Sequence, residues 1–68
     1  MEYGEVVTFE DVLCMAETED AILVEIEGED IWIPKSQVDD DSEVYGKGHD
    51  GRLVITAWIA KRKGLYDE

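Results

Sequence analysis

The alternation of hydrophobic and polar positions along the chain predicts a series of short β-strands. It is clearest in residues 21–27, where Ile22, Val24 and Ile26 share one face of an extended segment. β-branched and aromatic residues, which fit a pleated sheet, are concentrated in the same stretches. The predicted strands are residues 5–16, 21–27, 30–33, 42–45 and 52–56.

Two features interrupt or end these strands. Glu10 and Asp11 are adjacent acids that break the alternation of the first strand, so we expect a bulge and a bend there. Pro34 cannot donate to a strand ladder, and we expect it to end the third strand and to begin a 3₁₀ turn over residues 34–38. Turns are also expected at residues 17–20 and 46–51.

A tight hairpin is predicted between the second and third strands. We expect Gly28 and Glu29 to form its two-residue loop. The predicted cross-strand pairs are Glu27–Asp30, Ile26–Ile31 and Val24–Ile33. In this register the apolar sides of both strands coincide.

A short helix is predicted after the last strand. Thr56 is a suitable N-terminal cap for residues 57–63, and Gly64 followed by Leu65 is typical of a helix C-terminus. The cations at residues 61–63 suit the negative end of the helix dipole.

These elements predict one domain over residues 1–68, mainly β with a short C-terminal helix. We expect a small, strongly bent antiparallel sheet of about five strands, in an SH3-like half-open barrel. A domain of this size has little core in which to enclose an active site. The predicted core residues are Val7, Phe9, Leu13, Ile22, Val24, Ile26, Ile31, Ile33, Val44, Val54, Trp58 and Ile59.

Composition indicates a folded, soluble protein of a reducing cytoplasm. The hydrophobic fraction is 44%, which is that of a globular chain. Cys14 is the single cysteine, so an internal disulfide is excluded and a reducing compartment is expected. Residues 1–5 lack the basic and apolar regions of a signal peptide, and no apolar run is long enough to span a membrane.

The charge is strongly acidic and unevenly distributed. The chain has 18 Asp and Glu against 6 Lys and Arg, a net charge of -12. Residues 1–50 contain 16 acids and 2 bases, or -14, whereas residues 51–68 contain 4 bases and 2 acids, or +2. No Lys or Arg occurs between Glu10 and Asp30. Like charges at this density destabilise the compact state, so the charge serves either solubility or binding.

Catalytic, metal and phosphate sites are not supported by the sequence. His49 is expected to be an exposed loop residue and Cys14 a small buried hydrophobe, so we predict no enzyme and no cofactor. Residues 39–43 supply carboxylates of the kind that Ca²⁺ and Mg²⁺ prefer, but they lack EF-hand spacing, and we expect a solvated acidic turn. Residues 46–51 lack the spacing of a phosphate loop.

Direct nucleic-acid binding is disfavoured because a protein must neutralise phosphates to bind DNA or RNA, and this chain carries the same sign of charge. Binding to a DNA-binding protein is favoured instead, because spaced carboxylates on a rigid sheet can occupy its basic groove in place of DNA. Trp32 is either an anchor for a partner or a cover for the second side of a thin sheet. The candidate partner-binding residues are Glu10, Asp11, Glu25, Glu27, Glu29, Asp30, Trp32, Asp39, Asp40, Asp41 and Glu43.

Three stretches resemble small acidic single-domain proteins encoded by phages and prophages. They are residues 21–38, 41–44 and 53–60, within residues 20–65. Among such proteins the chain is most similar, by size and character, to anti-CRISPR proteins, including inhibitors of type I-C systems that are regarded as DNA mimics at the large subunit of Cascade. The resemblance implies a compact sheet-plus-helix fold and a non-enzymatic inhibitor, and it supplies no site residues.

Two functions therefore remain open. The first is an inhibitor whose acidic surface binds a basic, DNA-recognising protein such as a CRISPR effector subunit. The second is a small phage accessory module that contacts another protein through its sheet edge or basic helix, with the charge serving solubility only. A fold that depends on a divalent metal ion is a third alternative.

Overall fold

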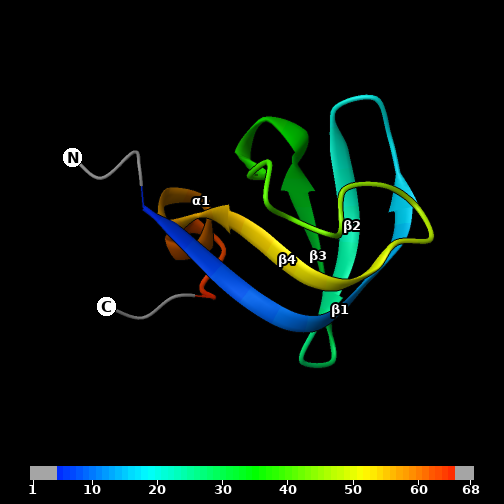
Figure 1. The fold of residues 1–68 in the computed structure, drawn as a ribbon, viewed down its shortest axis with the longest axis horizontal. Coiled ribbons are helices and arrows are strands. Elements are labelled where there is room, and N and C mark those ends of the chain that lie inside the picture. Colours follow the sequence, from blue (N-terminus) through cyan, green and yellow to red (C-terminus); the bar gives the residue numbers. More distant parts are fainter. Residues whose placement is uncertain (1–4, 66–68) are drawn as a thin grey trace.

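A computed structural model describes residues 5–65 of the chain as one curved antiparallel sheet with a short helix at its end (Figure 1). The elements are β1 (Val6–Glu17), β2 (Ala21–Ile26), β3 (Glu29–Pro34), the 3₁₀ helix η1 (Lys35–Gln37), β4 (Asp50–Thr56) and α1 (Ala57–Arg62). The strand order is β3-β2-β1-β4. The mainly-β fold with a C-terminal helix is confirmed, but the sheet has four strands rather than about five, and it does not close into a barrel.

The bulge predicted in β1 is confirmed. Phe9 pairs with Leu53 of β4 but the next pair is Val12 with Gly51, so β1 has one extra residue between these pairs. Asp11 lies in this interval with a φ of 58°, in the left-handed region. The extra residue shifts the inward-facing positions of β1 from odd to even numbers.

Because of this shift, the prediction that Leu13 lies in the core is wrong. Leu13 is 41% exposed, whereas its neighbours Val12 and Cys14 are buried. The prediction that Cys14 is a buried hydrophobe is confirmed. Its Sγ donates to the carbonyl oxygen of Ala16 at 3.2 Å, and burial raises the pKa of the thiol above its usual value.

The β2–β3 hairpin is confirmed, but its predicted register is wrong. Ile26 pairs with Glu29 and Val24 with Ile31, so the loop is Glu27-Gly28, one residue earlier than expected. Glu27 has a φ of 53° and Gly28 a φ of 86°. A type I′ turn requires positive φ at both loop positions and favours glycine at the second, and its twist matches that of the strands. The apolar sides of the strands still coincide in this register.

Residues 42–45, predicted as a strand, contain no strand. The segment 38–43 instead follows the outer edge of β4: Asp39 N–H donates to Val54 O at 2.8 Å and Glu43 N–H to Arg52 O at 2.8 Å. The Ser42 hydroxyl takes the place of a ladder hydrogen bond, because it accepts from Val54 N–H at 3.1 Å. This segment covers Val54, which is therefore buried although it points away from the concave side.

The predicted ends of the short helices are confirmed. Pro34 and Val38 flank η1. Thr56 Oγ1 accepts from Ile59 N–H at 3.2 Å and so caps α1. At the other end Leu65 N–H donates to Ala60 O and Gly64 N–H to Lys61 O, which is the Schellman arrangement expected for a glycine in the C′ position.

Trp58, predicted in the core, is instead 48% exposed on α1. The Arg62 guanidinium lies 5.2 Å from the centroid of its ring, one turn along the helix. Small residues take the inward positions of this helix, since Ala57 and Ala60 are buried beside Ile59. The buried core residues are Val12, Cys14, Ile22, Val24, Ile26, Ile33, Val44, Leu53, Val54, Ile55, Ala57, Ile59 and Ala60.

Predicted core positions at the margins are partly buried, namely Val7, Phe9 and Ile31.

In the described part of the chain, no helix has the length and hydrophobicity needed to cross a membrane. The expectation about a signal peptide concerned residues 1–5, of which 1–4 lie outside the described residues.

Glu17 connects three parts of the fold and makes stability sensitive to acid. Lys35 Nζ donates to Glu17 Oε2 at 2.6 Å, and Lys47 N–H donates to Oε1 at 3.1 Å. These hydrogen bonds, the one from Lys35 first, lower the pKa of the Glu17 carboxyl below its usual value. A carboxyl with a lowered folded-state pKa adds stability above its unfolded-state pKa, and that stability is lost as the pH falls through the folded-state pKa.

We therefore expect Lys35→Met to reduce the free energy of unfolding at pH 7, and to have a progressively smaller effect as the pH falls from there through the folded-state pKa of Glu17. Urea unfolding across this range measures the difference. Lys47→Met is the matched control, because the main chain of Lys47, and not its side chain, contacts Glu17. The same pH dependence in both variants would contradict this role of Lys35.

Candidate partner-binding surface

An acidic hollow of about 510 Å³ lies where the β1 bulge meets the β2–β3 hairpin. It is lined by Glu10 and Asp11 of β1, Glu25 of β2, and Glu27 and Gly28 of the hairpin loop. No Lys or Arg is among these lining residues. The structure thus brings together four of the predicted site residues, which we call the hairpin cluster: Glu10, Asp11, Glu25 and Glu27.

Two members of the hairpin cluster occupy left-handed backbone positions. Asp11 has a φ of 58° and Glu27 a φ of 53°, and they are the non-glycine residues with positive φ among the described residues. Aspartate adopts such positions readily, whereas glutamate does so at a cost in free energy. The fold therefore retains strain at Glu27, which lines the hollow where like charges gather.

We expect Glu27→Asn to stabilise the fold by about 0.5–1 kcal/mol, because it creates an Asn-Gly loop suited to a type I′ turn and relieves the cost of the left-handed position. Thermal or urea unfolding measures the change. Glu29→Asn is the matched control, since it removes the same charge from a strand position without positive φ. Equal stabilisation by both variants would show that charge relief alone is responsible.

The outer face of the sheet carries an acidic row beside an apolar one. The acidic row contains Asp30, Glu25 and Asp50 and is interrupted by Leu13 of β1, through the pairs Asp30–Glu25, Glu25–Leu13 and Leu13–Asp50. The pairs Trp32–Leu23 and Leu23–Ala16 form the adjacent apolar row. Trp32 is 43% exposed and Leu13 41% exposed. The sequence predictions placed Leu13 in the core and Asp50 in a turn before the strand. The slip of alternation at the bulge was the signal that reverses the face of Leu13.

Glu29 lies apart from the other acids of the hairpin. It pairs with Ile26, whose side chain is buried, so its side chain leaves the strand on the concave side. Among the candidate partner-binding acids of the hairpin, Glu29 therefore does not share a face with Glu25 and Asp30. The shifted register is the cause, because the predicted loop had placed Glu29 at the tip.

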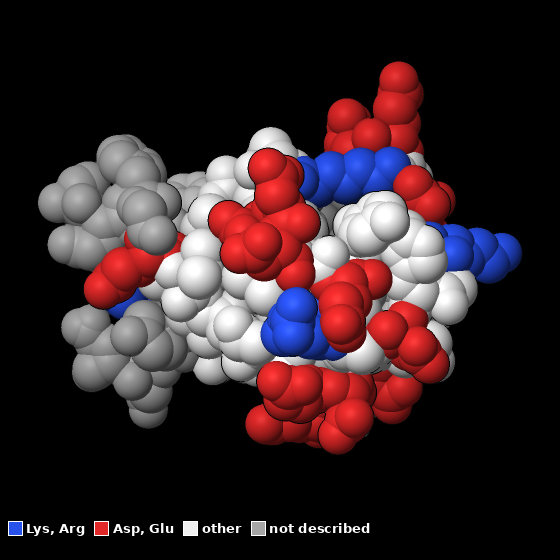
Figure 2. Space-filling model, in the orientation of Figure 1, with Lys and Arg blue, Asp and Glu red and all other residues white. Residues whose placement is uncertain are grey.

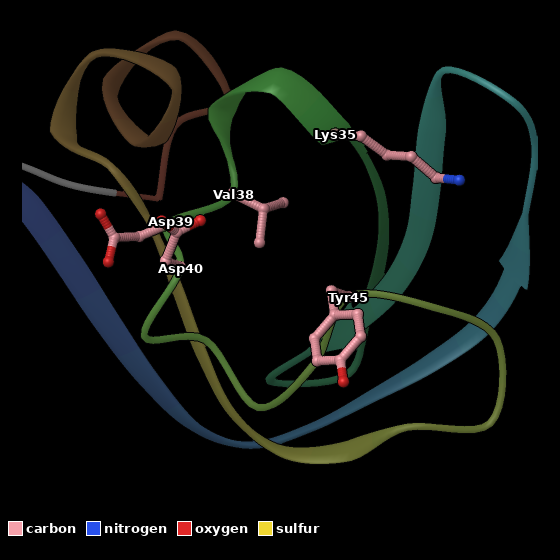
Figure 3. A pocket seen from close by; sticks show the side chains of 5 residues that line it. All are labelled: Lys35, Val38, Asp39, Asp40 and Tyr45. Carbon is pink, nitrogen blue, oxygen red and sulfur yellow. The ribbon is translucent and has the colours of Figure 1, made fainter.

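The acids of residues 39–43 form a separate group along the edge of β4. Asp39 and Asp40 line a hollow of about 430 Å³ together with Lys35, Val38 and Tyr45. Figure 3 shows the Lys35 side chain on the opposite side of this opening from both carboxylates. Asp39 Oδ2 accepts from Asp41 N–H at 3.0 Å, which fixes this acidic turn.

Cations accompany this second group of acids. Arg52 Nη2 donates to Asp41 O at 3.4 Å and lies 3.9 Å from Glu43 Oε2. Glu43 Oε1 also accepts from Arg52 N–H at 3.0 Å. The field of this group is therefore partly neutralised, whereas the hairpin cluster has no lining cation.

Acidic side chains do not form one continuous surface on the face that Figure 2 shows. They lie there in several separate groups, with basic side chains and uncharged surface between them. The predicted site residues therefore divide into the hairpin cluster with the neighbouring Asp30 and Trp32, the isolated Glu29, and the group at residues 39–43. Of these, the hairpin cluster is the candidate for binding.

His49 supports the loop in which it lies. It is half-buried rather than exposed as expected; its Nδ1 accepts from Tyr45 N–H at 3.3 Å, and the two rings meet edge to face at 4.3 Å. The sequence did not indicate this contact between residues four positions apart in a glycine-rich turn. Both groups of acids leave ample carboxylate oxygens for a cation, but among residues 5–65 no three His, Cys, Asp or Glu side chains are arranged to hold a metal ion.

Comparison with known protein families, with curated proteins and with solved structures finds no match to this chain.

Proposed function

We propose that this protein is a non-enzymatic inhibitor of the anti-CRISPR type, which binds a basic, DNA-recognising protein surface through its hairpin cluster and blocks access of DNA. The observation that supports this proposal is the hollow lined by four carboxylates and no cation. Such a site attracts a basic groove over distance and presents acceptors to Lys and Arg side chains on contact.

The charge density of the molecule is suited to partial imitation of DNA. Residues 5–65 contain 15 acids, which is 18 minus Glu2, Asp67 and Glu68, and 6 bases, a net charge of -9. The longest dimension is 32 Å. Duplex DNA of that length carries about 19 phosphate charges at one per 1.7 Å. The protein thus has about half the linear charge of DNA, enough to steer a basic groove, while the apolar row would supply packing.

The test is competition with DNA for a DNA-recognising complex, for which a type I-C Cascade is the first choice. Two variants change the net charge equally, from -12 to -8. The first neutralises the hairpin cluster with Glu10→Gln, Asp11→Asn, Glu25→Gln and Glu27→Asn. The matched control carries Glu19→Gln, Asp20→Asn, Asp40→Asn and Asp41→Asn.

We expect the unaltered chain to prevent target-DNA binding, the hairpin variant to lose at least about tenfold in potency, and the control to keep most of it. Inhibition should also weaken with salt, because the Debye length is about 8 Å at physiological ionic strength. Equal loss in both variants would assign the effect to net charge, and inhibition that salt does not change would contradict mimicry.

The accessory-module alternative is favoured by one observation, the separation of the acidic groups by basic and uncharged surface (Figure 2). In that case a partner captured from lysate is retained after nuclease treatment and is not displaced by added duplex DNA. Displacement by DNA supports mimicry.

A further inference from the structure

β3 is an edge strand, and its outer side has no partner strand within residues 5–65. The sheet order places β2 on one side of β3 and no other strand of this part of the chain beside it. At the opposite edge of the sheet, the segment 38–43 donates to β4 and so covers that strand. The two edges of the sheet therefore differ: one is capped by the chain itself, and the other is open.

The hairpin register identifies which backbone groups of β3 face outward. In a two-residue hairpin the residues that flank the loop, here Ile26 and Glu29, exchange both hydrogen bonds. The pairing alternates from there, so Ile31 and Ile33 point their N–H and C=O groups at β2. Asp30 and Trp32 point theirs away from the sheet. The bond from Lys35 N–H to Asp20 O at 2.8 Å continues the same alternation.

These outward groups have no hydrogen-bond partner among the described residues. Two N–H and two C=O groups, those of Asp30 and Trp32, are thus available at one edge. Open edges of this kind add a strand from another chain unless charge or proline blocks them. Pro34 blocks only the end of β3, because its ring removes one donor there.

The side chains along this edge specify the charge of the added strand. Asp30 lies directly opposite Glu25, and like charges in such a pair are destabilising. Neither carboxylate has an ion pair with a Lys or Arg among the described residues. A cation on the open side of Asp30 would relieve this repulsion. Trp32, two residues along on the same face, offers an exposed ring to an apolar neighbour.

We propose that the open edge of β3 captures an extended, Lys- or Arg-containing segment of the partner protein as an added antiparallel strand. A cationic residue of this segment lies opposite Asp30 and an apolar residue opposite Trp32. The proposal rests on the proposed function for the basic character of the partner, and it adds that recognition includes main-chain pairing. A second copy of this chain is disfavoured as occupant, because both copies carry a net charge of -12.

The probe is the peptide (Lys-Thr-Val-Thr)₂-Lys, which alternates cationic and apolar residues on one face. In the proposed complex the N–H groups of its Lys and Val residues point at β3, and those of Thr point away. Two further peptides with the same side chains as this parent peptide are compared with it. The first is N-methylated at the main chain of Lys and Val, and the second at the main chain of Thr. We expect the first to bind at least about tenfold more weakly and the second to bind like the parent.

Amide hydrogen exchange locates the bound strand on the protein. With peptide at about ten times its Kd, exchange at Asp30 and Trp32 should slow about tenfold, while Ile31 and Ile33, already bonded to β2, should not change. Asp30→Asn should weaken binding of the peptide and keep this alternating pattern. Trp32→Ala should weaken binding as well.

The remaining outcomes separate the edge proposal from the proposed function. Equal binding of all three peptides, with no slowing at Asp30 and Trp32, shows charge attraction alone; the proposed function then stands while strand addition fails. Slow exchange at both amides without peptide, together with a dimer in sedimentation, makes a second copy the occupant. Conversely, strand addition with no inhibition of DNA binding by the complex refutes the proposed function and leaves the edge site intact.

Discussion

Replacing Leu53 with alanine is expected to lower the free energy of unfolding by about 2–5 kcal/mol. Leu53 is fully buried on β4 and pairs with Phe9 of β1, so the substitution leaves a cavity between the two strands. A chain of this length has a total stability of about 3–10 kcal/mol at 0.05–0.15 kcal/mol per residue. The variant should therefore be partly or wholly unfolded at 37 °C, as urea and thermal unfolding would measure.

Leu13→Ala is the matched control, because the chemical change is the same at a site that is 41% exposed. We expect a loss below about 1 kcal/mol, because Leu13 lies on the outer face of the sheet, where a smaller side chain leaves no enclosed cavity. The pair also tests the bulge in β1, which determines that Val12 and not Leu13 faces the core. A larger loss at Leu13 than at Leu53 would show that β1 has the phase first predicted from the sequence.

Local signals in the sequence were sufficient to predict where the helices and the third strand begin or end. Thr56, Gly64 and Pro34 act through their own backbone and nearest neighbours, and each was assigned correctly. The bulge at residues 10–11 was also local, because two adjacent acids cannot both face solvent in a regular strand. The bulge also reverses the face of the residues that follow it, and the sequence prediction did not include the resulting burial of Val12.

Other features depend on contacts between distant segments. The hairpin register was wrong by one residue because two loops give coincident apolar faces, and backbone twist decides between them. Val54 is buried as predicted, but the cause is the segment 38–43 that covers it, which alternation along β4 cannot reveal. Leu53 and Ile55, which are fully buried, were not among the predicted core residues. In the site, Glu25 and Glu27 are neighbours by sequence, but Glu10 and Asp11 join them only through the bulge and the curvature of the sheet.

Ser42→Ala is expected to cost about 2–4 kcal/mol in the free energy of unfolding. Ser42 is 6% exposed, and its hydroxyl accepts from Val54 N–H at 3.1 Å and from Val44 N–H at 3.2 Å while donating to Val44 O at 2.8 Å. Alanine would leave two buried main-chain donors without an acceptor, each costing about 1–3 kcal/mol. The hydroxyl thus holds the irregular segment against β4. In a regular strand pair, a main-chain carbonyl group would accept this hydrogen bond instead.

Ser36→Ala on η1 is the matched control, because that side chain is exposed and makes no hydrogen bond with the described residues. We expect it to change the free energy of unfolding by less than about 0.5 kcal/mol. Amide exchange adds a local readout: in Ser42→Ala, exchange at Val44 and Val54 should accelerate more than at Ile22 in the core. Similar unfolding free energies for the two variants would mean that water can replace the hydroxyl, and that residues 38–43 are held to β4 by Asp39 and Glu43 alone.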